Sequence, residues 1–118
     1  MTLKECYQAM DASYDEVISR LRSERMVQKF ALKFLNDGSY QLLISSMEEG
    51  NCEEAFRAAH KLKGGCQNLA FTHLAQSSSA LTEALRSGMS PEAPGLLEKV
   101  KADYQRTVSA IQEFQASL

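Results

Sequence analysis

Apolar residues recur every three or four positions along almost the whole chain, which is the spacing of one face of an α-helix. No stretch alternates apolar and polar residues between turn signals, as a half-buried β-strand would. Glycine, proline, asparagine and serine interrupt the pattern at intervals and divide it into separate helices. The pattern therefore predicts an all-α protein.

Capping residues indicate where the first helices begin. Ser13 and Ser23 each precede an apolar stripe and can accept a hydrogen bond from a free amide of the first helical turn. The segment of about residues 2–21 is expected to form two short helices or one kinked helix, outside a core bundle of about residues 23–118. The Asn-Asp-Gly sequence at 36–38 predicts the end of the helix that follows Ser23. That helix is expected to bury a broad stripe, which consists of Met26, Val27, Phe30, Ala31, Phe34 and Leu35.

The later helices have similar signals. Asn51 is a favoured N-cap and is followed within the first turn by acidic residues, which suit the positive end of the helix dipole. Thr72 is expected to cap the next helix, and Ser90 to cap the last one with Pro91 in its first turn. The apolar residues of the last helix approach a heptad rhythm, which favours antiparallel packing. These elements predict one helical bundle with short loops.

Composition narrows the class of protein. A chain of 118 residues fits one domain with a single core, and 44% apolar and 24% charged residues are ordinary for a globular protein. The formal net charge is −2 and the lysines and arginines are scattered, so binding to nucleic acid is not expected. The three cysteines share no short spacing, so neither a disulfide framework nor a metal site is suggested.

Location and oligomeric state are predicted from what the sequence does not display. No leader pattern and no apolar stretch of membrane-spanning length is evident, so a cytoplasmic location without membrane contact is expected. A monomer is expected because the sequence shows no obvious exposed apolar stripe.

One short stretch, AAHKLKGGC at residues 58–66, requires a separate explanation. It places two glycines one turn after a histidine, although each glycine costs a helix interior about 1 kcal/mol relative to alanine. A step of about 100° per residue places His60 roughly 140° from the centre of the core-facing stripe, so its imidazole is predicted to face solvent. That stripe consists of Ala55, Ala59, Leu62, Cys66 and Leu69.

The residues around His60 suggest an anion site. Gly64 lies one turn further along the same face and leaves room beside the ring. Lys63 is close enough, three residues on, for its ammonium group to stabilise an anion carried by the imidazole. Since a neutral imidazole is a competent nucleophile near physiological pH, the arrangement suits a covalently carried anion.

A structural interpretation of the same residues stays open at this stage. An exposed histidine is most often a solvated side chain, and paired glycines can mark helix fraying or close helix packing. His73 is interpreted as a surface residue and Cys66 as a small core residue. A metal-dependent bundle enzyme is not favoured, because the chain lacks the Glu-x-x-His pairs that such sites use.

The sequence HKLKGGCQNL, which begins at His60, resembles the signature of histidine-containing phosphotransfer domains. In that signature an aliphatic residue, a lysine and a glycine follow the histidine at fixed distances. The resemblance extends over most of the chain, from YDEVISRLRSERMVQKFALKFLND through EEAFRAAHKLKGGCQNLAFTHL to LTEALRSG. It implies a four-helix up-and-down bundle with an additional N-terminal helical segment.

The resemblance also implies roles for individual residues. His60 would accept the phosphoryl group, Lys63 would neutralise and orient it, and Gly64 would leave space for it. A partner's receiver domain would supply the accepting aspartate and Mg²⁺, so the protein needs no cofactor, metal or ATP site of its own. A docking surface for receiver domains would include Phe56, Arg57, Lys61, Gly65, Gln67 and Asn68.

By this resemblance the protein is not an enzyme but a phosphorelay carrier. It would accept a phosphoryl group from a receiver aspartate of a hybrid sensor histidine kinase and pass it to a response regulator. The alternative is a module that docks receiver domains without carrying phosphate. The sequence departs from the family pattern at Ala70, where glycine is usual, and at Gln67, where a smaller residue is common. The first departure is expected to change how closely the helix of His60 approaches its neighbour, and the second to affect the choice of partner.

Overall fold

The computed structural model describes all 118 residues, and the chain forms helices without any strand. This confirms the all-α prediction. None of the helices is both long and apolar enough to cross a membrane. In chain order they are α1 (Leu3–Ala9), α2 (Tyr14–Leu21), α3 (Glu24–Phe34), α4 (Ser39–Glu48), α5 (Cys52–Asn68), α6 (Thr72–Leu85) and α7 (Ala93–Ala116).

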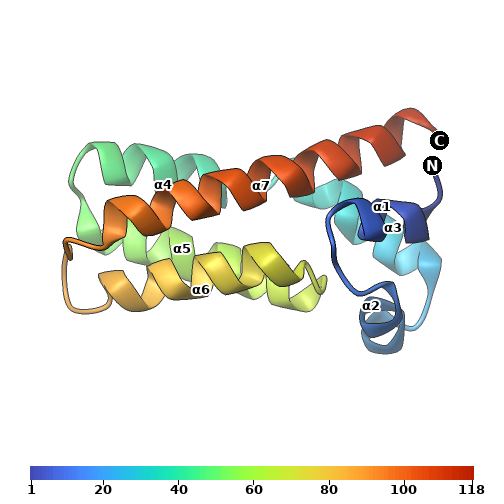
Figure 1. Cartoon of the computed structure of the whole chain (residues 1–118), viewed down its shortest axis with the longest axis horizontal. Coiled ribbons are helices and arrows are strands. Elements are labelled where there is room, and N and C mark those ends of the chain that lie inside the picture. Colours follow the sequence, from blue (N-terminus) through green and yellow to red (C-terminus); the bar gives the residue numbers. More distant parts are fainter.

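Helices α4, α5, α6 and α7 form a four-helix bundle (Figure 1). α5 packs against both α4 and α6, and α6 packs in turn against α7. Short loops reverse the chain between these helices, which produces the up-and-down order. α1, α2 and α3 gather at the other end of the molecule, near the C-terminal half of α7 (Figure 1). The predicted bundle with an additional N-terminal helical segment is therefore confirmed, but its boundary differs, because α3 lies with α1 and α2 and not in the core bundle that was expected to begin at about residue 23.

The core stripe predicted for α5 is also confirmed. Ala55, Ala59, Leu62, Cys66 and Leu69 are each at most 5% exposed. The alanines let neighbouring helices approach closely, and each fully buried leucine contributes about 1.5–3 kcal/mol. Burial raises the pKa of the Cys66 thiol, so this cysteine stays protonated and acts as a core residue.

Three of the predicted helix caps are confirmed. The side chains of Ser13, Ser23 and Asn51 each accept a hydrogen bond from the amide three residues later, at 3.1, 3.1 and 3.2 Å. Each cap satisfies one of the amides that a helix leaves without a partner in its first turn. The starts of α2, α3 and α5 therefore follow from local sequence.

The predicted caps Thr72 and Ser90 are wrong, because α6 and α7 begin without a side-chain cap. Thr72 is the first residue of α6, and its hydroxyl donates to the Ala70 carbonyl at 3.4 Å. The Ser90 carbonyl accepts a backbone hydrogen bond of 3.1 Å from the residue three positions on, so the chain turns at Pro91 before α7 starts. Pro94 takes the first-turn position that was predicted for Pro91.

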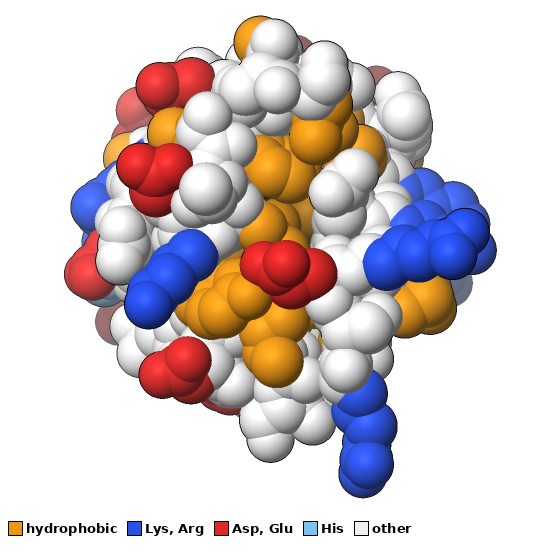
Figure 2. Space-filling view, turned by 90° about the vertical axis from the view of Figure 1, so that its right-hand side faces the viewer, with side chains coloured by type: hydrophobic (Ala, Val, Ile, Leu, Met, Phe, Trp, Pro, Cys, Tyr) orange, Lys and Arg blue, Asp and Glu red, His pale blue; other side chains and the backbone are white.

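The prediction that Met26 is buried is wrong, since this side chain is 38% exposed. α3 buries only Val27, Ala31 and Phe34, because its neighbours α2 and α7 cover a narrower stripe than the sequence predicted. Met26 lies at the end of the molecule formed by α1, α2, α3 and the C-terminus, where a band of apolar side chains lies among charged ones (Figure 2). Leu118, at the C-terminus, is 66% exposed. The molecule thus has an exposed apolar band that the sequence did not indicate.

The N-terminal helices are bonded to the end of α5. The Tyr7 hydroxyl of α1 donates to the Leu69 carbonyl at 2.7 Å, and the Arg20 guanidinium of α2 donates to the Gln67 carbonyl. Carbonyls at the end of a helix have no partner within the helix, so the bond from Tyr7 satisfies a carbonyl that would otherwise need water. The bond from Arg20 adds a second donor to the Gln67 carbonyl, which also accepts from the Ala70 amide. α1 and α2 thereby hold the C-terminal end of α5, the helix that carries His60.

Ala70 follows α5 in the left-handed region, with φ of +57°. The Phe71 amide donates to the Cys66 carbonyl at 2.9 Å, and the Ala70 amide donates to the Gln67 carbonyl at 3.2 Å. These two bonds are the Schellman pattern, which favours glycine at this position because an L side chain is strained there. The left-handed backbone at position 70 therefore favours the glycine that the family pattern has there.

We expect Ala70→Val to lower the free energy of unfolding by at least about 2 kcal/mol, because a β-branched residue is strained at positive φ and the position is buried. Ala70→Gly should change it by less than about 1 kcal/mol, because the relief of strain is offset by loss of a buried methyl group and by the larger entropy of unfolded glycine. Urea denaturation of both variants measures these differences. A valine variant as stable as the wild type would contradict the left-handed conformation of this residue.

Candidate functional site

His60 lies on the exposed face of α5, as the helical spacing predicted. Its ring centre is 6.1 Å from that of Phe56, with an angle of 14° between the two planes. Residues four apart on a helix lie one above the other, which explains the stack. Phe56 therefore restricts the orientation of the imidazole while the imidazole stays accessible to solvent.

The backbone beside His60 is bare. A Cβ atom placed on Gly64 or Gly65 would meet no atom within 4 Å, so close helix packing requires neither glycine. Both glycines lie within α5, which continues to Asn68, so they do not mark a frayed end. The two structural explanations of the glycine pair are thereby removed, and free space beside His60 remains.

Lys63 lies one helical turn after His60 and is partly buried. Its ammonium group forms no ion pair. The Glu83 carboxylate on α6 has a pKa below its usual range, chiefly because Arg86 donates hydrogen bonds to it, with smaller contributions from Lys63 and His60. The Lys63 ammonium is thus available to an anion near His60.

Helix α6 and its C-cap contribute two charged residues, Glu83 and Arg86, that the sequence did not predict for this site. Arg86 donates to the Glu83 carboxylate at 2.8 and 3.1 Å, and its guanidinium carbon lies 5.3 Å from the centre of the Phe56 ring. A chain of contacts therefore joins His60 through Phe56 to Arg86. The only sequence signal was the spacing of three residues between Glu83 and Arg86, which does not indicate the helix they face.

Arg57 and Lys61 lie on α5 on either side of His60 in sequence, and both are exposed. Arg57 is paired with Glu53 at 2.6 Å and with Glu54 at 2.5 Å, so its guanidinium is already occupied. Lys61 forms no ion pair. Of these two predicted docking residues, only Lys61 therefore presents an unengaged charge.

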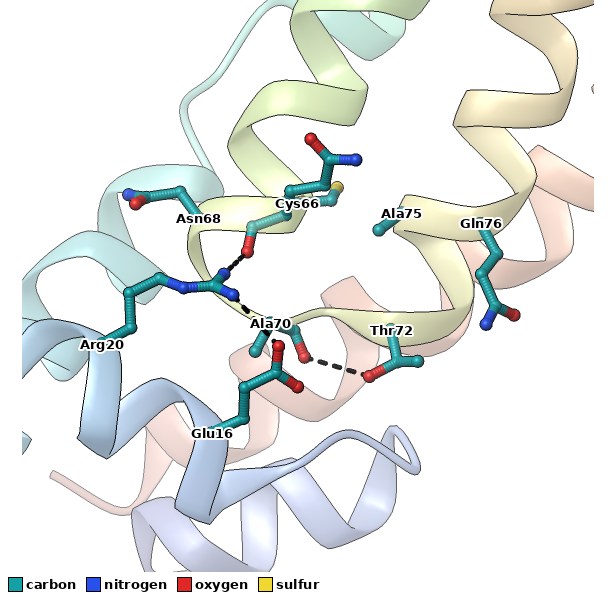
Figure 3. Close-up of a pocket in the computed structure, with 9 residues that line it drawn as sticks. Glu16, Arg20, Cys66, Asn68, Ala70, Thr72, Ala75 and Gln76 are labelled. Carbon is teal, nitrogen blue, oxygen red and sulfur yellow. Dashed lines mark hydrogen bonds and ion pairs between the residues drawn. The ribbon is translucent and has the colours of Figure 1, made fainter.

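The remaining predicted docking residues lie farther along α5. Gly65 and Asn68 line a hollow of about 170 Å³ toward α3. Asn68 and Gln67 also line a larger groove of about 590 Å³ between α2, the end of α5 and the start of α6 (Figure 3). Arg20 reaches across this groove from α2 and is paired with Glu16 of its own helix at 3.1 Å (Figure 3). Gly65, Gln67 and Asn68 follow His60 along α5 but do not surround it.

The candidate site is an open strip on α5, which we call the His60 strip and define as Phe56, His60, Lys63 and Gly64. It offers a ring nitrogen, a nearby ammonium group and unoccupied space. An opposite charge beside a nucleophilic ring can stabilise an anionic group bound to it. No group of three or more histidine, cysteine, aspartate or glutamate side chains in the molecule could hold a metal ion.

A helical bundle that carries an exposed histidine, with a lysine three residues later, is typical of a phosphotransfer module. The comparison with protein families agrees, because residues 22–110 of the 118 match the family model of the Hpt domain. The chain therefore belongs to the Hpt domain family, whose members are phosphotransfer carriers in phosphorelays and interact with response-regulator receiver domains. Comparison with curated proteins and with solved structures gives no match.

Proposed function

We propose that this protein carries a phosphoryl group on His60, which it accepts from a receiver aspartate of a hybrid sensor histidine kinase and passes to a response regulator. The observation that carries the proposal is the His60 strip. It combines an exposed imidazole, an unpaired ammonium at Lys63 and free space at Gly64 on a helix of an Hpt domain. These features supply a nucleophile, a counter-charge and access for a partner protein.

In the proposed transfer, a ring nitrogen of His60 attacks the phosphorus atom of an aspartyl phosphate. The nitrogen–phosphorus bond forms as the oxygen–phosphorus bond breaks, and the aspartate leaves as a carboxylate with the electron pair of that bond. Lys63 stabilises the negative charge of the phosphoryl group, and the receiver domain would bring Mg²⁺, which neutralises further charge. Onward transfer is the reverse reaction with a second receiver aspartate, and the histidine is regenerated.

We propose that receiver domains dock over the His60 strip and along α5 toward its C-terminal end. Lys61 offers an unengaged positive charge on this face. The two hollows that Gly65, Gln67 and Asn68 line make this docking surface concave. Arg57 would contribute only if a partner displaces its glutamates, since it is held by two of them.

The proposal is tested by incubating the protein with a phosphorylated receiver domain and searching for phosphate that is acid-labile and stable to base. We expect mass spectrometry to locate this phosphate on His60, and a second receiver domain to remove it. If several competent donors bind the folded protein without labelling it, the protein is a docking module that does not carry phosphate.

We expect Lys63→Ala to fold normally but to transfer phosphoryl about tenfold more slowly, because the phosphoryl charge loses an unpaired cation one helical turn away on α5. The lifetime of the phosphohistidine should also shorten. Rapid-quench measurement of transfer to a receiver domain gives both quantities. Lys63→Arg keeps the charge and should recover most of the rate, and an unchanged rate in the alanine variant would remove Lys63 from the mechanism.

A further inference from the structure

The contacts that lead away from His60 end in an ion pair on another helix. The His60 ring lies over Phe56, the Arg86 guanidinium lies 5.3 Å from the centre of the same Phe56 ring, and Glu83 accepts two hydrogen bonds from Arg86. Because a guanidinium above an aromatic face is attracted by the ring, Phe56 and Glu83 together hold Arg86 near the strip. One cation and one anion of α6 are thereby kept at a fixed place beside the candidate phosphoacceptor.

The charges of Glu83 and Arg86 act on the His60 strip with opposite sign. The low pKa of the Glu83 carboxylate is due mainly to Arg86, and Lys63 and His60 add small contributions, which agrees with the contacts that join Arg86 through Phe56 to His60. Glu83 therefore repels, and Arg86 attracts, any negative group that approaches His60 or is bound to it. Both side chains are exposed, so these interactions are screened by salt.

We infer that Glu83 of α6 and Arg86, the C-cap residue of α6, are positioning and charge-tuning residues that set how readily His60 accepts an anionic phosphoryl donor. Glu83 opposes the approach of the donor, and Arg86 favours it while it also holds Phe56 against the imidazole. This inference rests on the proposed function, since it takes His60 as the phosphoacceptor. It adds a second helix to the site, whose other residues all lie on α5.

The test uses phosphoramidate, a small anionic phosphoryl donor that requires no partner protein. In this reaction the His60 ring nitrogen bonds to phosphorus, the phosphorus–nitrogen bond of the donor breaks, and ammonia leaves. We expect Glu83→Gln to raise the initial rate of His60 phosphorylation about two- to fivefold at low ionic strength, and Arg86→Gln to lower it by a similar factor. Both differences should shrink from about 10 mM to about 1 M salt, where the screening length falls roughly tenfold.

Glu98→Gln is the matched control. Glu98 is an exposed carboxylate paired with a cation three residues on, Lys101, at 3.0 Å, but it lies on α7 and does not make the contact with the His60 strip that Arg86 makes. Its variant should label at the wild-type rate at every salt concentration. Circular dichroism and urea denaturation show whether all three variants keep the wild-type fold.

Opposite, salt-sensitive changes in the two α6 variants support the inference, because a purely structural role would slow both reactions. Changes in the same direction, or rates equal to that of the wild type in both variants, would overturn it. The proposed relay function is decided separately, by the exchange of phosphate with receiver domains. A wild-type protein that labels at His60 with phosphoramidate but exchanges with no receiver disproves the relay, and the two variants still decide the inference.

Discussion

His60→Gln should abolish the acid-labile phosphate completely, whether the donor is a phosphorylated receiver domain or phosphoramidate. Glutamine has no nucleophilic ring nitrogen, so the bond to phosphorus cannot form. His60 is exposed, and glutamine is a good helix former, so the free energy of unfolding should change by less than about 0.5 kcal/mol. Phosphate analysis by mass spectrometry and urea denaturation of the same preparation measure the two effects.

His73→Gln is the matched control for this variant, because His73 is the only other histidine of the chain. Its Nε2 atom lies 2.8 Å from the Asp11 carboxylate, so it joins the start of α6 to the turn between α1 and α2. This variant should keep full labelling and lose a little stability. Residual label in His60→Gln that disappears in the double variant would assign the phosphate to His73 and contradict the proposed site.

Gly64→Gln should make the protein more stable and a much poorer carrier. A helix gains up to about 1 kcal/mol when an exposed glycine is replaced by a residue of higher helix propensity, and no atom within 4 Å opposes a Cβ at this position. The longer side chain then fills the space beside His60, and a displacement of about 1 Å in docking can reduce a transfer rate ~10²-fold. Urea denaturation should show a higher free energy of unfolding, while the rate of phosphoryl transfer to a receiver domain should fall.

Gly95→Gln separates the effect on stability from the effect on function. Gly95 is also an exposed glycine within a helix, where an added Cβ meets nothing within 4 Å, but it lies in the first turn of α7. Its variant should transfer phosphoryl at the wild-type rate. If Gly64→Gln also transfers at that rate, the free space beside His60 has no role in transfer.

The features that depend on one helix alone could be predicted from the sequence. The stripe from Ala55 to Leu69 and the exposure of His60 follow from the 3.6-residue repeat, which every α-helix imposes on its own side chains. The caps Ser13, Ser23 and Asn51 also succeed, because each bonds an amide only three residues away.

Features that depend on neighbouring elements could not be predicted in this way. Thr72 and Ser90 are good capping residues, but the turns before α6 and α7 place other residues at the helix starts. Met26 is apolar and correctly spaced, yet the helices beside α3 are too few to cover it. Local sequence gives a preference in each case, and the packing of the whole chain overrides it.

The sequence by itself determined that this protein is a helical bundle with an outward-facing histidine, because helix periodicity and the spacing of His60, Lys63 and Gly64 lie within one element. Only the tertiary structure decided that Ala70 is left-handed and that Glu83 and Arg86 join the site. The rotation of α6 against α5 is set by interlocking core side chains, and neither helix encodes that relation alone. For that reason the contact between Arg86 and Phe56 becomes visible only when the two helices are packed together.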